Sequence, residues 1–364
     1  MASIDQAIAA PDESVDHGVA WHYGDPLGEQ RALVERGGVV DLSHLGVVSV
    51  SGSDRLSWLN DLTSQLVANL VPGSSSMALI LDPKGHVEHE LRLVDDGVVT
   101  WLISERSQVD GLVAYLDSMR FMRDVAVQDT SNDWAALWLA VPEDGSAAVA
   151  DAAIEVLAGL DPVIIWNPPA EFLGTGETDA GEDRGGTAAK YVPERPGSLT
   201  GVLALIPRAD LQSFLAERDD LAGTWAFEAL RVAAGVPRSA LEGDHRALPH
   251  ELGLIGPAVH LAKGCYRGQE TVARVHNMGK PPRRLALLHL DGSAGDLPVT
   301  GADVLWNGRA IGRVGSVAQH YELGPIALAV LKRSVPVEDV LEVALGDEED
   351  SPTVAATQQV IVVA

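Results

Sequence analysis

Cysteine is nearly absent from this chain of 364 residues, which carries one thiol, Cys265. A single cysteine excludes an intramolecular disulfide, a zinc ribbon and an iron–sulfur cluster held by four cysteines of the same chain. Long apolar runs are also missing, because no stretch reaches the roughly 18 apolar residues of a membrane span. The first sixteen residues contain carboxylates but no Lys or Arg, unlike a signal peptide. We therefore expect a soluble, reduced, cytoplasmic protein.

Positive charge is the second scarcity. The chain has 26 Lys and Arg residues against 52 Asp and Glu, which gives a formal net charge of −26. Binding to phosphate backbones or anionic lipids depends on a basic field, so we expect no nucleic-acid and no membrane partner. The simplest interpretation of the acidity is solubility. Apolar residues make up 46% of the chain, and its length exceeds what a single core usually supports, so more than one structural unit is expected.

The hydrophobic pattern alternates between periods of 2 and 3.6 residues, which predicts an α+β fold. Strands are expected over 39–50 (with a turn at Ser43-His44), 77–82, 88–94, 98–103, 137–141 and 202–206, and helices over 53–66, 108–120, 147–157, 209–217 and 225–234. After Pro281-Pro282, short β segments predict a small β-barrel; they lie at 285–290, 303–306, 309–316, 326–331 and 359–363.

Three regions follow from this pattern. Residues 1–20 are expected to be a flexible N-terminus, 21–282 the main α+β region, and 283–364 the barrel domain. A Gly/Thr/Asp/Glu-rich stretch at 171–198 has no periodicity and is expected to be a mobile surface loop.

Most other polar patterns carry little chemistry. On a strand, His86, Glu88 and Glu90 would share one face, so a metal site is conceivable, but an exposed polar face is the simpler interpretation. His250-Glu251 lacks the second histidine of a zinc protease. Gly174-Thr-Gly176 lacks the further glycine and the helix of a dinucleotide site.

The chemistry concentrates instead at Lys263-Gly-Cys-Tyr-Arg-Gly-Gln-Glu270, which contains the lone thiol. Cationic neighbours such as Lys263 and Arg267 favour the thiolate, and glycines allow another backbone to approach. A structural cysteine would instead sit among apolar side chains. The pattern therefore indicates a functional thiol, and the nearby His276-Asn-Met278 is expected to line the same cleft.

This octapeptide, with Val272-Ala-Arg274 and His276-Asn-Met-Gly279, resembles the signature of the YgfZ family. That family consists of folate-binding proteins that support iron–sulfur enzymes, within the superfamily of GcvT, the aminomethyltransferase of glycine cleavage. Further segments resemble the family in the same order, namely 38–46, 50–54, 59–63, 82–93, 230–237 and 247–252. The resemblance implies ferredoxin-like sheet–helix units around a central channel that holds a tetrahydrofolate-type ligand, followed by a C-terminal barrel.

The resemblance also implies roles for individual residues. The carboxylate that stands near the folate nitrogens in the enzymes falls on Glu90, or less closely on Glu88, although the enzymes have aspartate. The glutamate that grips the pterin falls on Ala233, which removes a strong acceptor. Within and beside the signature, the residues expected to contact folate are Lys263, Tyr266, Gly268, Gln269, Glu270 and Arg274. Arg231 would hold the glutamate tail or lie on a helix surface.

Cys265 separates two functions. Methylene transfer to folate uses a proton acceptor and no thiol, whereas iron–sulfur assembly or repair can use a thiolate as a shared cluster ligand or as a redox-sensitive group. We expect a folate-binding accessory protein that acts with iron–sulfur assembly proteins or client enzymes and does not turn over substrate. The alternatives are a tetrahydrofolate-dependent aminomethyltransferase and, less favoured, a domain of a sarcosine-type oxidoreductase.

Overall fold

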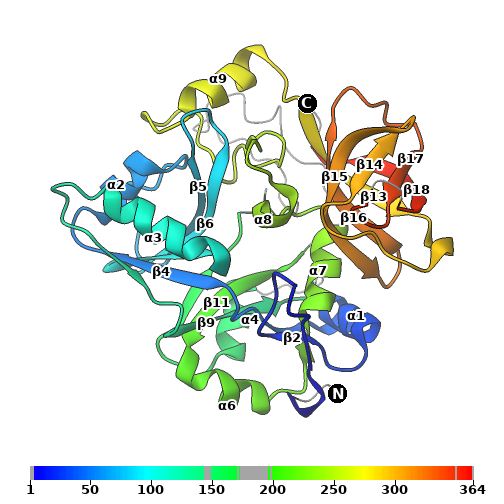
Figure 1. Ribbon diagram of the computed structural model, residues 1–364. Coiled ribbons are helices and arrows are strands. Elements are labelled where there is room, and N and C mark those ends of the chain that lie inside the picture. Colours follow the sequence, from blue (N-terminus) through cyan, green and yellow to red (C-terminus); the bar gives the residue numbers. More distant parts are fainter. Residues whose placement is uncertain are drawn as a thin grey trace. The chain divides into compact units, whose positions relative to one another are not determined.

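The computed structural model describes residues 4–142, 149–169, 199–348 and 351–362, together with Phe172 and Pro196 (Figure 1). These residues fall into two compact units. Unit 1 draws on Met1–Ile80, His89–Pro169 and Thr200–Phe227, and unit 2 on Leu81–Glu88, Ala170–Leu199 and Glu228–Ala364. None of the helices in these ranges is long and apolar enough to cross a membrane. The predicted loop at 171–198 lies almost entirely outside the described residues.

One sheet of unit 1 has five strands with two helices against one face. Its order is β5 (Ser74–Leu81), β6 (Val87–Asp95), β7 (Val99–Ser104), β4 (Gly46–Ser51), β8 (Ala126–Asp129), and the helices are α2 (Arg55–Leu62) and α3 (Val109–Ser118). Leu91 and Leu93 of β6 pack in the same core cluster as Leu112 and Leu116 of α3. Because side chains alternate along a strand, Glu90 lies on the opposite face of the sheet.

The second sheet of unit 1 also has five strands. Its order is β10 (Ile164–Trp166), β11 (Gly201–Pro207), β9 (Trp134–Ala140), β3 (Gly38–Asp41), β12 (Leu221–Ala222), antiparallel except between β12 and β3. Helices α4 (Val149–Val156) and α6 (Leu211–Ala216) bury side chains against one face of this sheet. The observed strands and helices of both sheets begin and end within a few residues of most predicted segments.

Helix α1 (Pro26–Arg36) was not predicted, although its start carries the usual signals. Asp25 caps the helix by accepting the Gly28 N–H, and Pro26 occupies the first turn. Glu29 then holds the helix in place, since its carboxylate accepts the backbone N–H groups of Tyr23 (2.7 Å) and Gly223 (2.9 Å).

The N-terminal segment is attached within unit 1. Strand β1 (Ile8–Ala9) pairs with β2 (Ala20–His22), and Asp16 Oδ1 lies 3.1 Å from His44 Nε2. A short 3₁₀ turn, η1 (Ile4–Gln6), precedes them. The predicted flexibility of residues 1–20 stays a prediction.

Unit 2 contains a closed six-stranded barrel in the order β13 (Arg283–Leu290), β16 (Gly324–Lys332), β15 (Arg309–His320), β14 (Asp303–Trp306), β17 (Leu341–Ala344), β18 (Thr353–Val360). The α+β fold with a C-terminal barrel is therefore confirmed, whereas the exact domain boundaries stay a prediction. Two strands correct the sequence analysis. β17 was missed, and the last strand was placed at 359–363 but ends at Val360, because its inward residues Val354, Ala356 and Gln358 give a weak hydrophobic signal.

Three further helices carry residues that are considered below as functional candidates or their neighbours. They are α7 (Thr224–Ala233), α8 (Ser239–Glu242) and α9 (Gln269–Met278). Helix α9 corrects the sequence analysis, which places no helix over these residues. Val272 and His276 are its buried residues, and their spacing of four is the helical signal that was available.

Arg283, at the start of the barrel, supports a prediction about pH. Its guanidinium donates to Asp244 Oδ2 (2.7 Å) and Glu251 Oε2 (2.7 Å). Hydrogen bonds from Arg283 lower the pKa of Asp244 to about 2, against the opposing effect of burial. A lowered carboxyl pKa gives stability that is present above the unfolded-state pKa, about 3.9, and is lost as pH falls toward 2.

We expect wild type to lose up to about 1 kcal/mol more than Asp244→Asn between pH 6 and pH 3, after allowance for the 40% exposure of the Asp244 side chain. Urea unfolding at both pH values measures this difference. Asp303→Asn is the control, since Asp303 makes a longer, exposed pair with Arg313 at 3.6 Å. Parallel losses in wild type and Asp244→Asn would contradict the assignment.

Candidate functional site

The octapeptide at 263–270, which we call the thiol loop, leads into helix α9 of unit 2. Gly268 is the residue before the helix and has φ +81°, a left-handed conformation that L-residues rarely adopt. The loop closes on itself through Gln269, whose backbone N–H donates to Tyr266 O (3.2 Å) and whose side-chain amide donates to Lys263 O (3.4 Å). The geometry therefore places two signature residues, Gly268 and Gln269, in structural roles.

Within the thiol loop, some side chains are buried and others are exposed. Cys265 is a free, exposed thiol. Lys263 and Tyr266 are buried, with the Lys263 ammonium 5.3 Å from the centre of the Tyr266 ring. Burial raises the pKa of Tyr266 to about 12, so its phenol stays protonated. The buried Lys263 and Tyr266 thus hold the loop in place around the exposed sulfur.

A second turn of unit 2, Asp82-Pro-Lys-Gly85, packs directly against the thiol loop. A Cβ on Gly268 would lie 2.5 Å from Asp82 O and 2.9 Å from Gly85 Cα, and a Cβ on Gly85 would lie 2.9 Å from Thr271 Cβ. Two glycines therefore face each other because no side chain fits between the two backbones. The contact explains why each segment carries a glycine at this point.

Asp82 fixes the shape of that turn. Its carboxylate accepts the N–H groups of Lys84 (2.7 Å) and His86 (2.9 Å), and lies 3.0 Å from His86 Nδ1. Burial alone raises the pKa of Asp82, but these hydrogen bonds outweigh it and lower the pKa. His86 therefore belongs to the turn and not to strand β6, which corrects the prediction that it shares a strand face with Glu88 and Glu90.

Glu88 has a partner that the sequence analysis missed. Its Oε2 lies 2.8 Å from Arg267 Nη1 of the thiol loop. Across residues 4–142, 149–169, 199–348 and 351–362, no three His, Cys, Asp or Glu side chains gather as a metal site. The predicted effect of Lys263 and Arg267 on the ionisation of Cys265 stays a prediction, and both cations have the partners just described.

Helix α9 carries buried and exposed functional candidates. His276 and His250 are both buried, and their ring centres lie 6.2 Å apart. Burial lowers the pKa of His250 to about 3, and the charge of His276 contributes to this shift. Asn277, Arg274 and Glu270 are exposed. The expectation that His276 lines a cleft beside the thiol stays a prediction.

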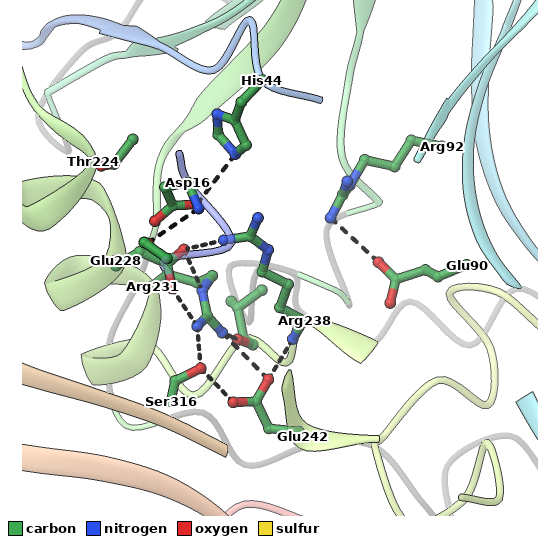
Figure 2. Close-up of polar contacts among 12 residues, drawn as sticks. Asp16, His44, Glu90, Arg92, Thr224, Glu228, Arg231, Arg238, Glu242 and Ser316 are labelled. Atoms are coloured by element: carbon green, nitrogen blue, oxygen red, sulfur yellow. Dashed lines mark hydrogen bonds and ion pairs between the residues drawn. The ribbon is translucent and has the colours of Figure 1, made fainter. Parts of the chain in front are cut away.

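Glu90 lies in unit 1 and is 6% exposed, so the expectation of an exposed polar strand face is wrong at this position. Its Oε1 lies 3.3 Å from Nη2 of Arg92, two residues further along β6, and Figure 2 shows the two side chains pointing toward each other. Arg92 also lies over the ring of Trp166, at 5.8 Å. Arg92 was missed, although a spacing of two on a strand places both residues on one face.

The ion pair limits what Glu90 can do. The Arg92 guanidinium places a positive charge beside the carboxylate and occupies one of its oxygens. The carboxylate is thus arranged as a charge-compensated acceptor for hydrogen bonds. A role in acid–base chemistry stays a prediction.

Arg231, in the unit 2 part of α7, is 3% exposed and is not the helix-surface residue considered above. Its guanidinium donates to both carboxylate oxygens of Glu228 (2.9 and 2.6 Å) and to Val236 O (2.6 Å), bonds Ser316, and lies 3.5 Å from Glu242 (Figure 2). These contacts favour a structural role. The proposed contact between Arg231 and a folate tail stays a prediction.

Ser316 links the opposite charges of this network, because its hydroxyl bonds both Arg231 and Glu242. We expect Ser316→Ala to lower the free energy of unfolding by about 2 kcal/mol, the usual cost of removing hydrogen bonds to buried charged groups. Urea unfolding measures the loss. Ser334→Ala, at an exposed position of the same unit, is the control and is expected to change stability by less than about 0.5 kcal/mol. Equal effects would show that Ser316 is not part of the network in solution.

The chain was compared with known proteins. The model of the GCVT N-terminal domain matches residues 19–155. A probable aminomethyltransferase of Natronomonas pharaonis is 29% identical over 89% of this chain and 87% of its own length. The tRNA-modifying protein YgfZ of Yersinia pestis is 24% identical over 89% of this chain and 95% of its own.

A solved structure extends the likeness to three dimensions. The glycine cleavage system aminomethyltransferase T of Bartonella henselae superposes with a TM-score of 0.71 at 16% identity and covers 98% of this chain and 93% of its own. At that identity the match establishes the fold alone. Residues 19–155 thus match the GCVT N-terminal domain, and the chain as a whole is similar to proteins of the GcvT/YgfZ-like superfamily.

Proposed function

We propose that this chain is a folate-binding accessory protein of the YgfZ type, which supports iron–sulfur cluster assembly or repair through the thiol of Cys265. The observation that carries the proposal is the exposed sulfur on a loop that buries Lys263 and Tyr266 and whose Gly268 is packed against a second turn. A cysteine without a function would not require a loop held in place by this packing. The fold and the YgfZ-named relatives support the assignment.

Cys265 would act with a partner. One thiolate supplies one of the four ligands that a cubic or rhombic cluster needs, so an assembly protein, a client enzyme or a small thiol supplies the others. In this role the sulfur gives up its proton to solvent and donates an electron pair to iron, without any change in oxidation state. The partner, the reduced state of the thiol and the cytoplasmic location belong to the proposal.

The described residues fit a folate-type ligand in part. In unit 1, the indole N–H of buried Trp138 has no acceptor in the part of the chain that the structure describes, and the Phe227 ring lies 5.4 Å from its ring. A ring carbonyl of a pterin could take that N–H, and Glu90 could take pterin N–H donors. Ala233 offers no carboxylate, which is the main departure from the enzymes. Bound folate would supply one-carbon chemistry or a regulatory signal.

An aminomethyltransferase is the second candidate, and the 29% identity to a probable aminomethyltransferase favours it. Two observations oppose it: Glu90 is paired with Arg92, and alanine stands where the pterin carboxylate is expected. The name of the YgfZ relatives refers to tRNA modification. The net charge of −26 opposes binding of a polyanion such as tRNA. We therefore propose that any link to tRNA runs through cluster enzymes and not through binding of tRNA by this chain.

Tetrahydrofolate titration tests the folate half of the proposal. Eight tryptophans give the fluorescence signal, and we expect saturable quenching. Trp138→Phe keeps the ring and removes the N–H, so it is expected to weaken binding about tenfold, the cost of one lost hydrogen bond to a buried ligand. Trp306→Phe in the barrel is the control. No binding would leave only the thiol half of the proposal.

A glycine-cleavage assay separates the two candidates. Purified chain, lipoyl carrier and tetrahydrofolate are expected to form no methylenetetrahydrofolate. Formation at a rate comparable to an aminomethyltransferase assayed in parallel would replace the accessory role by the enzymatic one.

A further inference from the structure

One end of the barrel in unit 2 concentrates the positive charge that the chain otherwise lacks. Five cations lie where β13 begins and β16 ends: Lys280, Arg283, Arg284, Lys332 and Arg333. We call them the basic end. Arg283 and Lys332 are direct cross-strand partners, and Figure 1 shows β13 and β16 as neighbours. Like charges in facing positions destabilise a sheet, so this arrangement needs compensation.

Arg283 is compensated by Asp244 and Glu251, as described above, whereas Arg284 makes no hydrogen bond to a described carboxylate. Arg284 is 8% exposed, and its guanidinium donates only to neutral oxygens: Arg333 O (3.1 Å), Val335 O (2.8 Å) and Gln358 Oε1 (3.0 Å). Its Nε has no partner within the described ranges. A buried cation that hydrogen-bonds to no carboxylate is costly, because burial removes its hydration.

Arg333 repeats the pattern on the surface beside it. Its Nε donates to Pro281 O (3.0 Å) and its backbone N–H to Pro282 O (3.0 Å), and none of the described carboxylates forms an ion pair with it. The two guanidinium groups repel each other, since burial and then the charge of Arg333 lower the pKa of Arg284, while Glu338 acts in the opposite sense. Lys332 Nζ likewise bonds a carbonyl, Ala310 O (3.1 Å).

We propose that the basic end is a binding site for a phosphate group, held by the Arg333 guanidinium and neutralising Arg284. A guanidinium presents parallel N–H donors that match the oxygens of a phosphate, and the terminal nitrogens of Arg333 make no hydrogen bond to described residues. A phosphate monoester carries nearly two negative charges at neutral pH, enough for both arginines. The site lies outside the thiol loop and the Glu90 pair, so it does not depend on the function proposed above.

The source of the phosphate follows from the charge of the whole chain. A net charge of −26 repels a polyanion at long range, whereas a small ligand senses mainly the local field within a Debye length of about 8 Å. A phosphorylated small molecule is therefore the expected ligand. A phosphodiester of RNA offers similar oxygen acceptors with one negative charge and is the alternative source.

Phosphorus-31 NMR of inorganic phosphate with the full chain, at constant ionic strength in chloride buffer, tests the site. We expect saturable binding that Arg333→Gln weakens at least tenfold. Arg313→Gln removes the same charge from a barrel side chain that is 77% exposed, and is expected to leave binding unchanged. Equal affinity of wild type and Arg333→Gln, or the absence of saturable binding, overturns the proposal.

A second measurement covers the case in which a variant is poorly folded. Phosphate is expected to raise the Tm of wild type and of Arg313→Gln above their values in chloride, and to leave the Tm of Arg333→Gln unchanged. Titrations with adenosine 5′-monophosphate and with a 12-nucleotide RNA distinguish the two sources of the phosphate. Tighter binding of the nucleotide supports the small-molecule source, and tighter binding of RNA that is lost in Arg333→Gln supports the same site with a polynucleotide source.

Discussion

Cys265→Ala is expected to abolish the ability of this chain to restore iron–sulfur enzyme activity in cells that lack it, while the protein remains folded. The thiol is exposed, so its removal leaves no cavity and is expected to change the free energy of unfolding by less than about 0.5 kcal/mol. Activity is lost because the chain has no second thiol to replace the ligand. The measurement is client-enzyme activity at matched protein level.

Two variants sharpen this experiment. Cys265→Ser keeps the size of the side chain and a hydrogen-bonding atom but binds iron far more weakly, so it is expected to fail like alanine. Gly264→Ala alters the adjacent position, where a Cβ meets no atom within 4 Å, and is expected to restore activity fully. Full rescue by Cys265→Ala would remove the thiol from the mechanism and leave folate binding as the only function to pursue.

Gly268→Ala is expected to destabilise the protein by about 3 kcal/mol. The left-handed backbone at φ +81° costs an alanine about 1–2 kcal/mol, and the new Cβ would overlap Asp82 O at 2.5 Å, which adds about 1–3 kcal/mol. Urea unfolding measures the loss. The same variant is expected to expose the thiol loop to proteases, because the Asp82–Gly85 turn can no longer pack against it.

The matched control lies in the same octapeptide. Gly264→Ala adds the same methyl group in open space and is expected to change stability by no more than about 1 kcal/mol, the usual range for glycine to alanine without strain. Similar losses for the two glycines would mean that the loop does not pack against the turn. Cys265→Ala thus removes the thiol and keeps the packing of the loop, whereas Gly268→Ala keeps the thiol and disrupts that packing.

The sequence predicted the local elements well where a hydrophobic period was strong. The strands that became β4, β7 and β11 are apolar and β-branched, and they lie within a few residues of their predicted positions. The pattern failed where it was weak: β17 has four residues, β18 alternates small and polar side chains, and α9 buries only two residues. Helix α1 was missed despite Asp25 and Pro26, whose signals were not used.

The site was predictable as a list of residues but not as an arrangement. Cys265 and its glycines stand out in the sequence, whereas the pairing of Arg267 with Glu88 joins residues 179 positions apart. Glu90 was expected at an exposed strand face, yet it is buried beside Arg92. Arg231 was expected to meet a ligand or solvent, yet Glu228, Glu242 and Ser316 surround it.

By itself, the sequence determined the single thiol, the excess of acidic residues, the α+β class and the octapeptide signature, because composition and local periodicity do not depend on distant contacts. Only the tertiary structure decided which charges are compensated. Arg267, Arg92 and Arg231 each form an ion pair with a carboxylate, whereas Arg284 donates hydrogen bonds only to neutral oxygens. Electrostatic and hydrogen-bond energies depend on distance and burial in space, and the chain order does not contain either quantity.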